Sequence, residues 1–250
     1  MRIDRGGFSL HYEIAGSGSE SVVLTHGLAS SGATWSALVA ALSPHYRVVT
    51  WDLRSHARSD SPDEPCTIAA LGADLAAVVA AADGAPAHLL GHSAGGVITM
   101  RCALDHPALV RSVTLVGTSS ECNARAVTFY ESLAKTAERD GGAAAIRRLG
   151  TRDEPTMPPE GRGFAHMARA MASLHTAPLT AELEDVRCPA LVVVGEKDVL
   201  GVGGSVIISR RLPRARLEIV PERGHSIFHE DPAGFARLVL GFLAERRAAG

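Results

Sequence analysis

The residues with the clearest chemical potential are the five of Gly91-His92-Ser93-Ala94-Gly95. They follow a short apolar segment, His88 to Leu90, and precede a run of helical spacing that begins near Gly96. G-x-S-x-G between a strand and a helix is typical of a serine on a sharp turn, where small neighbours let the strand and helix pass closely. The hydroxyl then lies at a helix N-terminus, which favours developing negative charge. We predict that Ser93 is a nucleophile; the alternative is an ordinary glycine- and serine-rich turn.

A serine hydroxyl is a poor nucleophile until a base removes its proton, and an imidazole held by a carboxylate can do so. Among the 11 histidines, His225 is the one that follows the last predicted strand, and Asp198 follows the strand before it. Polar residues after strands gather at the carboxyl edge of a parallel sheet. We predict that His225 is the base and Asp198 its acid partner. Glu121, after an earlier strand, is the rival acid.

Apolar runs alternate with helical spacing along the chain, and several runs are apolar on both faces, as in strands covered by helices on either side. This alternation predicts a mostly parallel sheet wrapped by helices, with an antiparallel start. The predicted strands are residues 8–14, 21–25, 47–51, 87–90, 112–116, 190–194 and 216–220. The predicted helices are residues 35–42, 68–82, 96–105, 205–211 and 232–247.

Residues 120–185 interrupt this rhythm. They show helical segments with no strand between them, separated by Asp140-Gly141-Gly142 and by the proline-rich residues 155–159. The pattern predicts a short helical cap inserted over one edge of the sheet. Residues 1–119 and 186–250 would form the core domain.

Composition excludes several other classes of function. A formal net charge of -2 over 250 residues offers no field for nucleic acid or an anionic membrane, so a small-molecule substrate is expected. There is no apolar leader and no run of about 18 apolar residues, which predicts a cytoplasmic protein. The four cysteines lie far apart, which indicates no metal site and no disulfide framework. We expect no cofactor, and the sequence leaves open whether the chain forms a homodimer.

These motifs, taken together, resemble the α/β-hydrolase superfamily nearly from end to end. Within it the chain resembles the compact members with a short helical cap, such as 3-oxoadipate enol-lactonases and small carboxylesterases. The resemblance implies an α/β-hydrolase fold and an oxyanion hole formed by the backbone N–H groups of Leu28 and Ala94. It also implies a serine hydrolase that cleaves a small carboxylic ester or lactone through an acyl-enzyme on Ser93. The matching segments are residues 22–27, 52–54, the serine turn 91–95, 189–195 with Asp198, 224–225 and 230–232.

Two loops depart from the family pattern. The usual D-x-R-G-x-G-x-S loop occupies residues 52–59, and both of its glycines are replaced, by Ser55 and Ala57. Positive backbone angles cost more there, so we expect the loop to lie differently and to bring the Ser55 or His56 side chain into its surroundings. The segment after Asp198 is unusually rich in glycine.

Other side chains are candidates for binding the substrate, and each has a purely structural or solvent-exposed alternative. His26 would support the loop that carries Leu28, and His92 the turn that carries Ser93; alternatively, either would contact the substrate. Aromatic and methionine side chains would line a pocket or belong to the core; they are Trp35, Phe129, Tyr130, Met167 and Met171. Four cap arginines would bind a carboxylate or face solvent; they are Arg125, Arg147, Arg148 and Arg169.

Two other functions remain open at this level. A cofactor-free lyase or cyclase would use the same three residues as acid and base without acyl transfer. A ligand-binding protein without catalytic activity would share the fold but not the chemistry. The complete set of Ser93, His225 and Asp198 disfavours the inactive binding protein. Dehalogenases and epoxide hydrolases need an aspartate where this chain has Ser93, so they are excluded.

Overall fold

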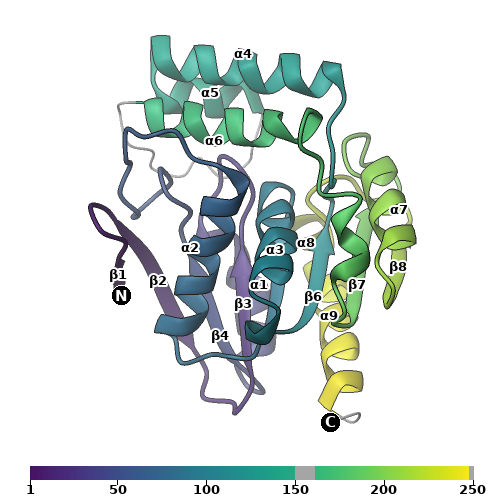
Figure 1. Cartoon of the computed structure of the whole chain (residues 1–250). Helices are drawn as coiled ribbons and strands as arrows, with labels where there is room; N and C mark the ends of the chain where they lie inside the picture. The colour runs from purple at the N-terminus through teal and green to yellow at the C-terminus, as the bar shows by residue number, and fades with distance from the viewer. Residues whose placement is uncertain (150–160, 248–250) are drawn as a thin grey trace.

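One eight-stranded sheet organises the chain, and six of its strands run parallel. The computed structural model describes residues 1–149 and 161–247. The strand order is β1-β2-β4-β3-β5-β6-β7-β8, with β1 and β2 antiparallel to their neighbours (Figure 1). The strands are β1 (Arg2–Asp4), β2 (Ser9–Ala15), β3 (Ser21–Thr25), β4 (Arg47–Trp51), β5 (Ala87–His92), β6 (Val110–Val116), β7 (Ala190–Gly195) and β8 (Ala215–Val220).

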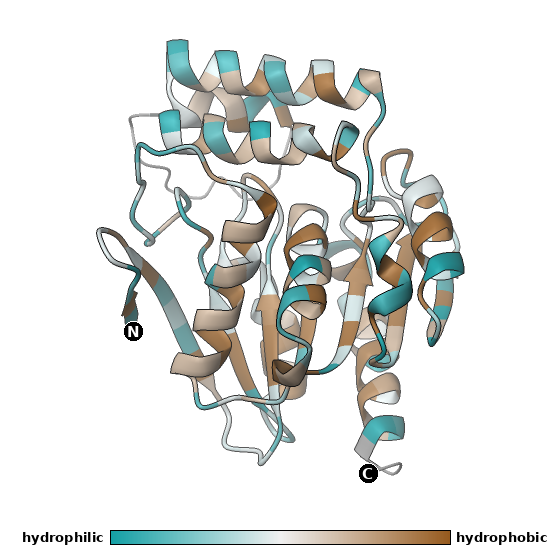
Figure 2. Cartoon of the chain, in the orientation of Figure 1, coloured by the Kyte–Doolittle hydropathy of each residue, from teal (hydrophilic) through white to brown (hydrophobic). Residues whose placement is uncertain are grey.

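Alternate residues of the central strands enter two separate apolar cores, one on each face of the sheet. Val23 and Leu89 pack with α2 and α3, whereas Val22 and Leu90 pack with α1 and α9. This two-sided burial is why the strands read as continuous apolar runs, and they are largely brown in Figure 2. The helices beside the sheet are α1 (Ser36–Leu42), α2 (Ile68–Ala81), α3 (Ala94–Asp105), α7 (Val202–Arg211), α8 (Ile227–Glu230) and α9 (Pro232–Arg247).

Three further helices lie together over the carboxyl edge of the sheet, at the top of Figure 1. They are α4 (Ala124–Asp140), α5 (Gly142–Leu149) and α6 (Arg162–Ala172). They share a small core of their own, in which Leu133 and Ala137 of α4 meet Phe164 and Ala168 of α6. The 3-10 helices Ser173–His175 and Glu182–Asp185 then lead back to β7. The division into a cap of residues 120–185 and a core domain stays a prediction, and the predicted break at residues 155–159 lies outside the described residues.

The predicted mostly parallel sheet covered by helices is confirmed, and its seven predicted strands all exist. Strand β1 was not predicted, because three residues at the edge of a sheet carry no periodic signal. The predicted helix 35–42 is preceded by a 3-10 helix, Gly32–Trp35. No helix of the described residues is long and apolar enough to cross a membrane.

The contact between α6 and the loop after β4 yields a stability prediction. A Cβ added at Gly163 would lie 2.1 Å from Ser55 Oγ and 2.9 Å from Ser55 Cβ. Gly163→Ala should therefore lower the free energy of unfolding by about 1–3 kcal/mol through overpacking. Gly203→Ala is the matched control, because that helical glycine has nothing within 4 Å of the added Cβ, and it should raise stability by about 0.5–1 kcal/mol. Urea unfolding measures both; a Gly163→Ala variant as stable as wild type would contradict the close packing.

Candidate active site

Ser93 lies on a strained turn between β5 and α3. Its backbone angles are φ 53° and ψ -119°, and a non-glycine residue with positive φ is uncommon. A Cβ on Gly91 would lie 2.2 Å from the carbonyl oxygen of Gly95, and one on Gly95 would lie 2.4 Å from that of Thr25. Glycine is required at both positions because strand and helix backbones meet there, and the turn leaves the Ser93 side chain partly exposed.

The turn at Ser93 is held by β6 and the residues after it. The Ser93 N–H donates to the carbonyl of Val116 at 2.9 Å, and Thr118 Oγ1 donates to the carbonyl of Ser93 at 2.7 Å. The predictions from sequence did not include Thr118. Its one signal is its position directly after a buried strand at the edge where the other polar residues gather.

His225 and Asp198 are in direct contact. His225 Nδ1 lies 2.8 Å from Asp198 Oδ2. The other carboxylate oxygen, Oδ1, accepts the N–H groups of Leu200 and Gly201 at 3.0 and 2.9 Å. Asp198 is 2% exposed, so its charge is held by these bonds rather than by water. The rival Glu121 accepts a bond from Thr180 Oγ1 at 2.5 Å instead.

The loops that carry these residues meet at one edge of the sheet. A Cβ on Gly27 would lie 3.2 Å from Ser93 Cβ. A Cβ on Gly117 would lie 2.9 Å from Asp198 Oδ2 and 3.2 Å from His225 Nδ1. The loop after β3 therefore touches the serine, and the residue after β6 touches the histidine and its acid.

Two backbone donors near the Ser93 turn have no hydrogen bond within the described residues. The N–H groups of Leu28 and Ala94 donate to no residue in the described parts of the chain. Ala94 is the first residue of α3, whose N-terminus favours negative charge. An oxyanion hole formed by these two groups stays a prediction.

Two buried histidines fasten the loop after β3 to the loop after β4. His26 Nε2 accepts the N–H of Leu53 at 3.0 Å, while its Nδ1 lies 2.7 Å from the carbonyl of Gly27. His56 Nε2 accepts the N–H of Ala29 at 3.1 Å, and its Nδ1 lies 2.9 Å from the carbonyl of Arg54. Burial lowers the pKa of His26 to about 4 and that of His56 to about 3. Both rings are therefore neutral, with one donor and one acceptor each.

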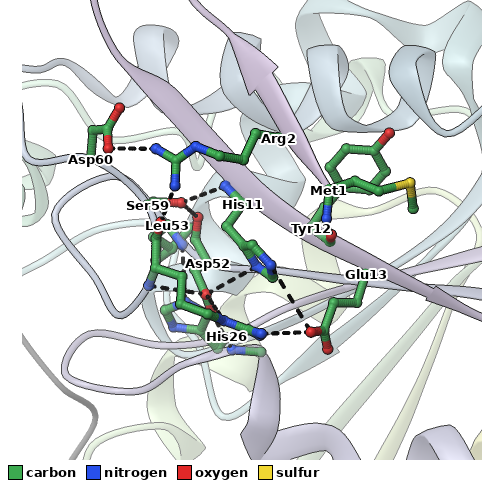
Figure 3. Close-up of polar contacts among 12 residues, drawn as sticks. Met1, Arg2, His11, Tyr12, Glu13, His26, Asp52, Leu53, Ser59 and Asp60 are labelled. Atoms are coloured by element: carbon green, nitrogen blue, oxygen red, sulfur yellow. Dashed lines mark hydrogen bonds and ion pairs between the residues drawn. The ribbon is translucent and has the colours of Figure 1, made fainter.

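The loop after β4 keeps positive backbone angles where its two glycines are replaced. Ser55 has φ 61° and Ala57 has φ 44°. As expected, His56 enters the surroundings of the loop, through the bond to Ala29. The loop is anchored on its other side by β2 (Figure 3): the N–H of His11 donates to Ser59 Oγ at 2.9 Å, and Ser59 Oγ donates to the carbonyl of Asp52 at 2.5 Å.

The candidate substrate contacts divide into different environments. His26 is fully buried with both ring nitrogens bonded to backbone groups, so none is left for a substrate. His92 is 8% exposed and its ring lies 4.6 Å from that of His225, centroid to centroid. Trp35 and Met167 are fully buried in the two cores on either face of the sheet, so both belong to the core rather than to a pocket surface.

The remaining candidates lie on the cap helices. Phe129 is exposed on α4, and Tyr130 packs against two of the cores, where burial raises its pKa to about 12. Met171 is buried on α6. Arg125, Arg147 and Arg148 are exposed, and Arg169 is paired with Glu138 at 2.5 Å. A cavity of about 520 Å³ on α4 and α5 is lined by none of the predicted site residues except Arg148.

A serine on a strand-to-helix turn and a histidine–aspartate pair, carried by loops at the carboxyl edge of a parallel sheet, are typical of one class of hydrolases. The chain belongs to the alpha/beta hydrolase family, whose model matches residues 22–238. It is similar to a putative carbamate hydrolase, RutD, of Caulobacter sp. (strain K31), with 29% identity over 96% of this chain and 97% of that protein.

Solved structures of the same family are similar over nearly the whole chain. The enol-lactonase from Burkholderia xenovorans LB400 is 25% identical with a TM-score of 0.87, covering 98% of this chain and 100% of its own. A hydrolase from Pseudomonas aeruginosa PA01 is 27% identical with a TM-score of 0.86, covering 97% of each chain. The predicted family and its enol-lactonase and esterase neighbours are thereby confirmed.

The buried histidines give a prediction about acid stability. The unfolded chain protonates a histidine near pH ~6.5, whereas folded His26 and His56 resist protonation until pH falls to about 4 and about 3. Between these values the unfolded state binds more protons, so the free energy of unfolding falls as pH is lowered. His56→Asn should reduce that fall, measured between about pH 7 and about pH 4.5, by about 2 kcal/mol.

The control for acid stability is His45→Asn, because His45 is exposed. That variant should keep the pH dependence of wild type in urea unfolding at each pH. An equally steep fall in His56→Asn and wild type would show that His56 is not held neutral by burial.

Proposed function

We propose that this hydrolase cleaves a small, uncharged carboxylic ester or lactone through an acyl-enzyme on Ser93. What supports this is the contact between His225 Nδ1 and Asp198 Oδ2, together with the strained turn of Ser93 at the same edge of the sheet. With Nδ1–H donated to the carboxylate, Nε2 carries the lone pair and can act as the base. The assignment of Ser93, His225 and Asp198 to these roles is part of the proposal.

The reaction has two acyl-transfer steps. His225 Nε2 takes the Ser93 proton as Oγ attacks the carbonyl carbon, and the oxyanion accepts the N–H groups of Leu28 and Ala94. The C–O bond to the alcohol then breaks, and the alcohol leaves with the proton from His225. A water molecule, deprotonated by His225, attacks the acyl carbon and releases the acid with regeneration of Ser93.

The electrostatics of the described cap residues favour an uncharged substrate. Met171 and Tyr130 contribute apolar surface to the cores between cap and sheet, whereas Arg169 is neutralised by glutamates of α4. A buried carboxylate would need a paired cation, and the described cap arginines are exposed or already paired. A small neutral acyl group meets no such requirement.

A carbamate is the second candidate substrate class, because the relatives named putative carbamate hydrolases cover nearly the whole chain at 29% and 28% identity. A carbamate carbonyl would use the same nucleophile and oxyanion donors as an ester. The lyase or cyclase alternative also uses Ser93, His225 and Asp198, but forms no acyl-enzyme. Substrate tests separate these three chemistries.

The identity of the nucleophile can be tested by covalent labelling. A fluorophosphonate should add to wild-type protein once, at Ser93, because His225 activates that hydroxyl. Ser93→Ala should abolish the label and lower kcat by several orders of magnitude, roughly 10⁴-fold or more. Intact mass and peptide mapping measure the label, and Ser119→Ala is a matched control that should label like wild type. Equal labelling of Ser93→Ala and wild type would refute the assignment.

The size of the acyl site can be tested with esters of different chain length. The cap of α4 to α6 is short, so 4-nitrophenyl acetate and butyrate and five- or six-membered lactones should have higher kcat/KM than 4-nitrophenyl decanoate. A decanoate preference of about tenfold or more would exclude a small acyl site. Faster turnover of an aryl N-methylcarbamate than of the matched acetate would favour the carbamate class. Labelling of Ser93 without turnover of any of these compounds would favour the lyase or cyclase.

A further inference from the structure

His92 connects the nucleophile turn to the loop of the base. It is the last residue of β5, directly before Ser93, and its Nε2 lies 3.1 Å from the main-chain carbonyl oxygen of His225. A carbonyl oxygen accepts only, so Nε2 must carry the proton. Burial lowers the pKa of His92 well below its usual value, which leaves the ring neutral with Nδ1 unprotonated.

Packing holds the His92 ring in this position. Its centroid lies 4.6 Å from that of His225 and 4.9 Å from that of Phe228, which meets it edge-on. Phe228 in turn lies 4.6 Å from Trp35. On the other side, a Cβ on Gly27 would come within 3.2 Å of His92 Nδ1. The ring is enclosed, so it can transmit the position of β5 to the loop of His225.

The main chain at His225 has a different constraint from its side chain. Asp198 fixes the ring through Nδ1, but a carboxylate contact alone permits the loop between β8 and α8 to shift while the ring follows. The base must reach Ser93 Oγ and later the leaving group, and proton transfer is sensitive to sub-ångström distances. The two residues before His225 are held by the Lys197 N–H bond to the carbonyl of Arg223 and by the Gly224 N–H bond to Glu230. The bond from His92 restrains His225 itself, from the strand that carries Ser93.

We propose that His92 is a positioning residue: its Nε2–H bond to the carbonyl of His225 sets the separation between the base and the adjacent Ser93. This inference rests on the proposed function, because it assumes that Ser93 and His225 react together. His92 contacts neither substrate nor reacting atoms in this role. Its bond fixes the base from the same strand that presents the nucleophile.

Three variants separate the bond from the packing of the ring. His92→Phe keeps a flat buried ring and removes the donor. His92→Gln keeps an N–H donor at similar reach, and His92→Asn keeps an amide that is too short to reach the carbonyl. The matched control is His88→Phe on the same strand, which removes a different buried contact, His88 Nδ1 to Ser112 Oγ at 2.7 Å.

The readouts are kcat and KM on 4-nitrophenyl acetate, the rate of fluorophosphonate labelling of Ser93, and Tm. His92→Phe and His92→Asn should lose about 10- to 100-fold in kcat and in labelling rate, with KM within about threefold of wild type. His92→Gln should recover most of both rates. His88→Phe should lower Tm with little change in either rate. His92→Asn tests the bond independently if His92→Phe does not fold.

Opposite results would overturn the proposal. Equal kcat losses in His92→Phe and His88→Phe would make the effect one of general stability. A His92→Gln variant as slow as His92→Phe would assign the effect to the ring rather than to its N–H. Failure of the proposed function is distinct, because wild-type protein would then fail to hydrolyse the ester, whether or not Ser93 labels.

Discussion

The close approach of β5 and α3 is the constraint on which the rest of the site depends. Gly91 lets β5 pass α3, and Gly95 lets α3 pass the end of β3, at distances that no Cβ could share, and Ser93 between them is left at φ 53°. Such a conformation costs on the order of 1–3 kcal/mol and persists only where the surroundings over-determine it. Here the bond from the Ser93 N–H to Val116, the bond from Thr118 to the Ser93 carbonyl and the nearby backbone of Gly27 do so.

The same need for rigidity explains the neutral histidines next to the site. His26 and His56 each satisfy one N–H and one C=O group of loops that lie outside the strands and helices. Buried backbone groups without partners would cost about 1–3 kcal/mol each. An imidazole serves as both donor and acceptor only while neutral. The protein therefore exchanges acid stability for a fixed loop after β3.

The sequence predicted those features that depend on local pattern. Strands 21–25 and 47–51 were predicted to the residue because apolar side chains lie on both of their faces, and the chain order of Ser93, Asp198 and His225 predicted that the last two meet. The catalytic roles of these residues stay predictions. The direction in which a helical side chain points was beyond the sequence: Trp35 and Met167 are fully buried in separate cores.

Contacts between distant loops were also beyond the sequence, because they depend on how the loops are folded. The loop after β4 was expected to lie differently without its glycines, yet Ser55 and Ala57 keep positive φ. The bond from Ala29 to His56 and the bond from Gly32 to Asp52 offset that strain from outside the loop. Spacing alone identifies none of these partners.

The two constraints on His225 act on different degrees of freedom. Asp198 bonds to the ring and so selects its rotation and tautomer, while His92 bonds to the backbone and so selects the position of the loop. A hydrogen bond to a ring cannot restrain a backbone that moves with it, and a bond to the backbone cannot choose a tautomer. Asp198 follows β7 and His92 ends β5, so His225 is bonded to residues from the two strands that flank β6. The carbonyl of the last residue of β6 also accepts the N–H of Ser93.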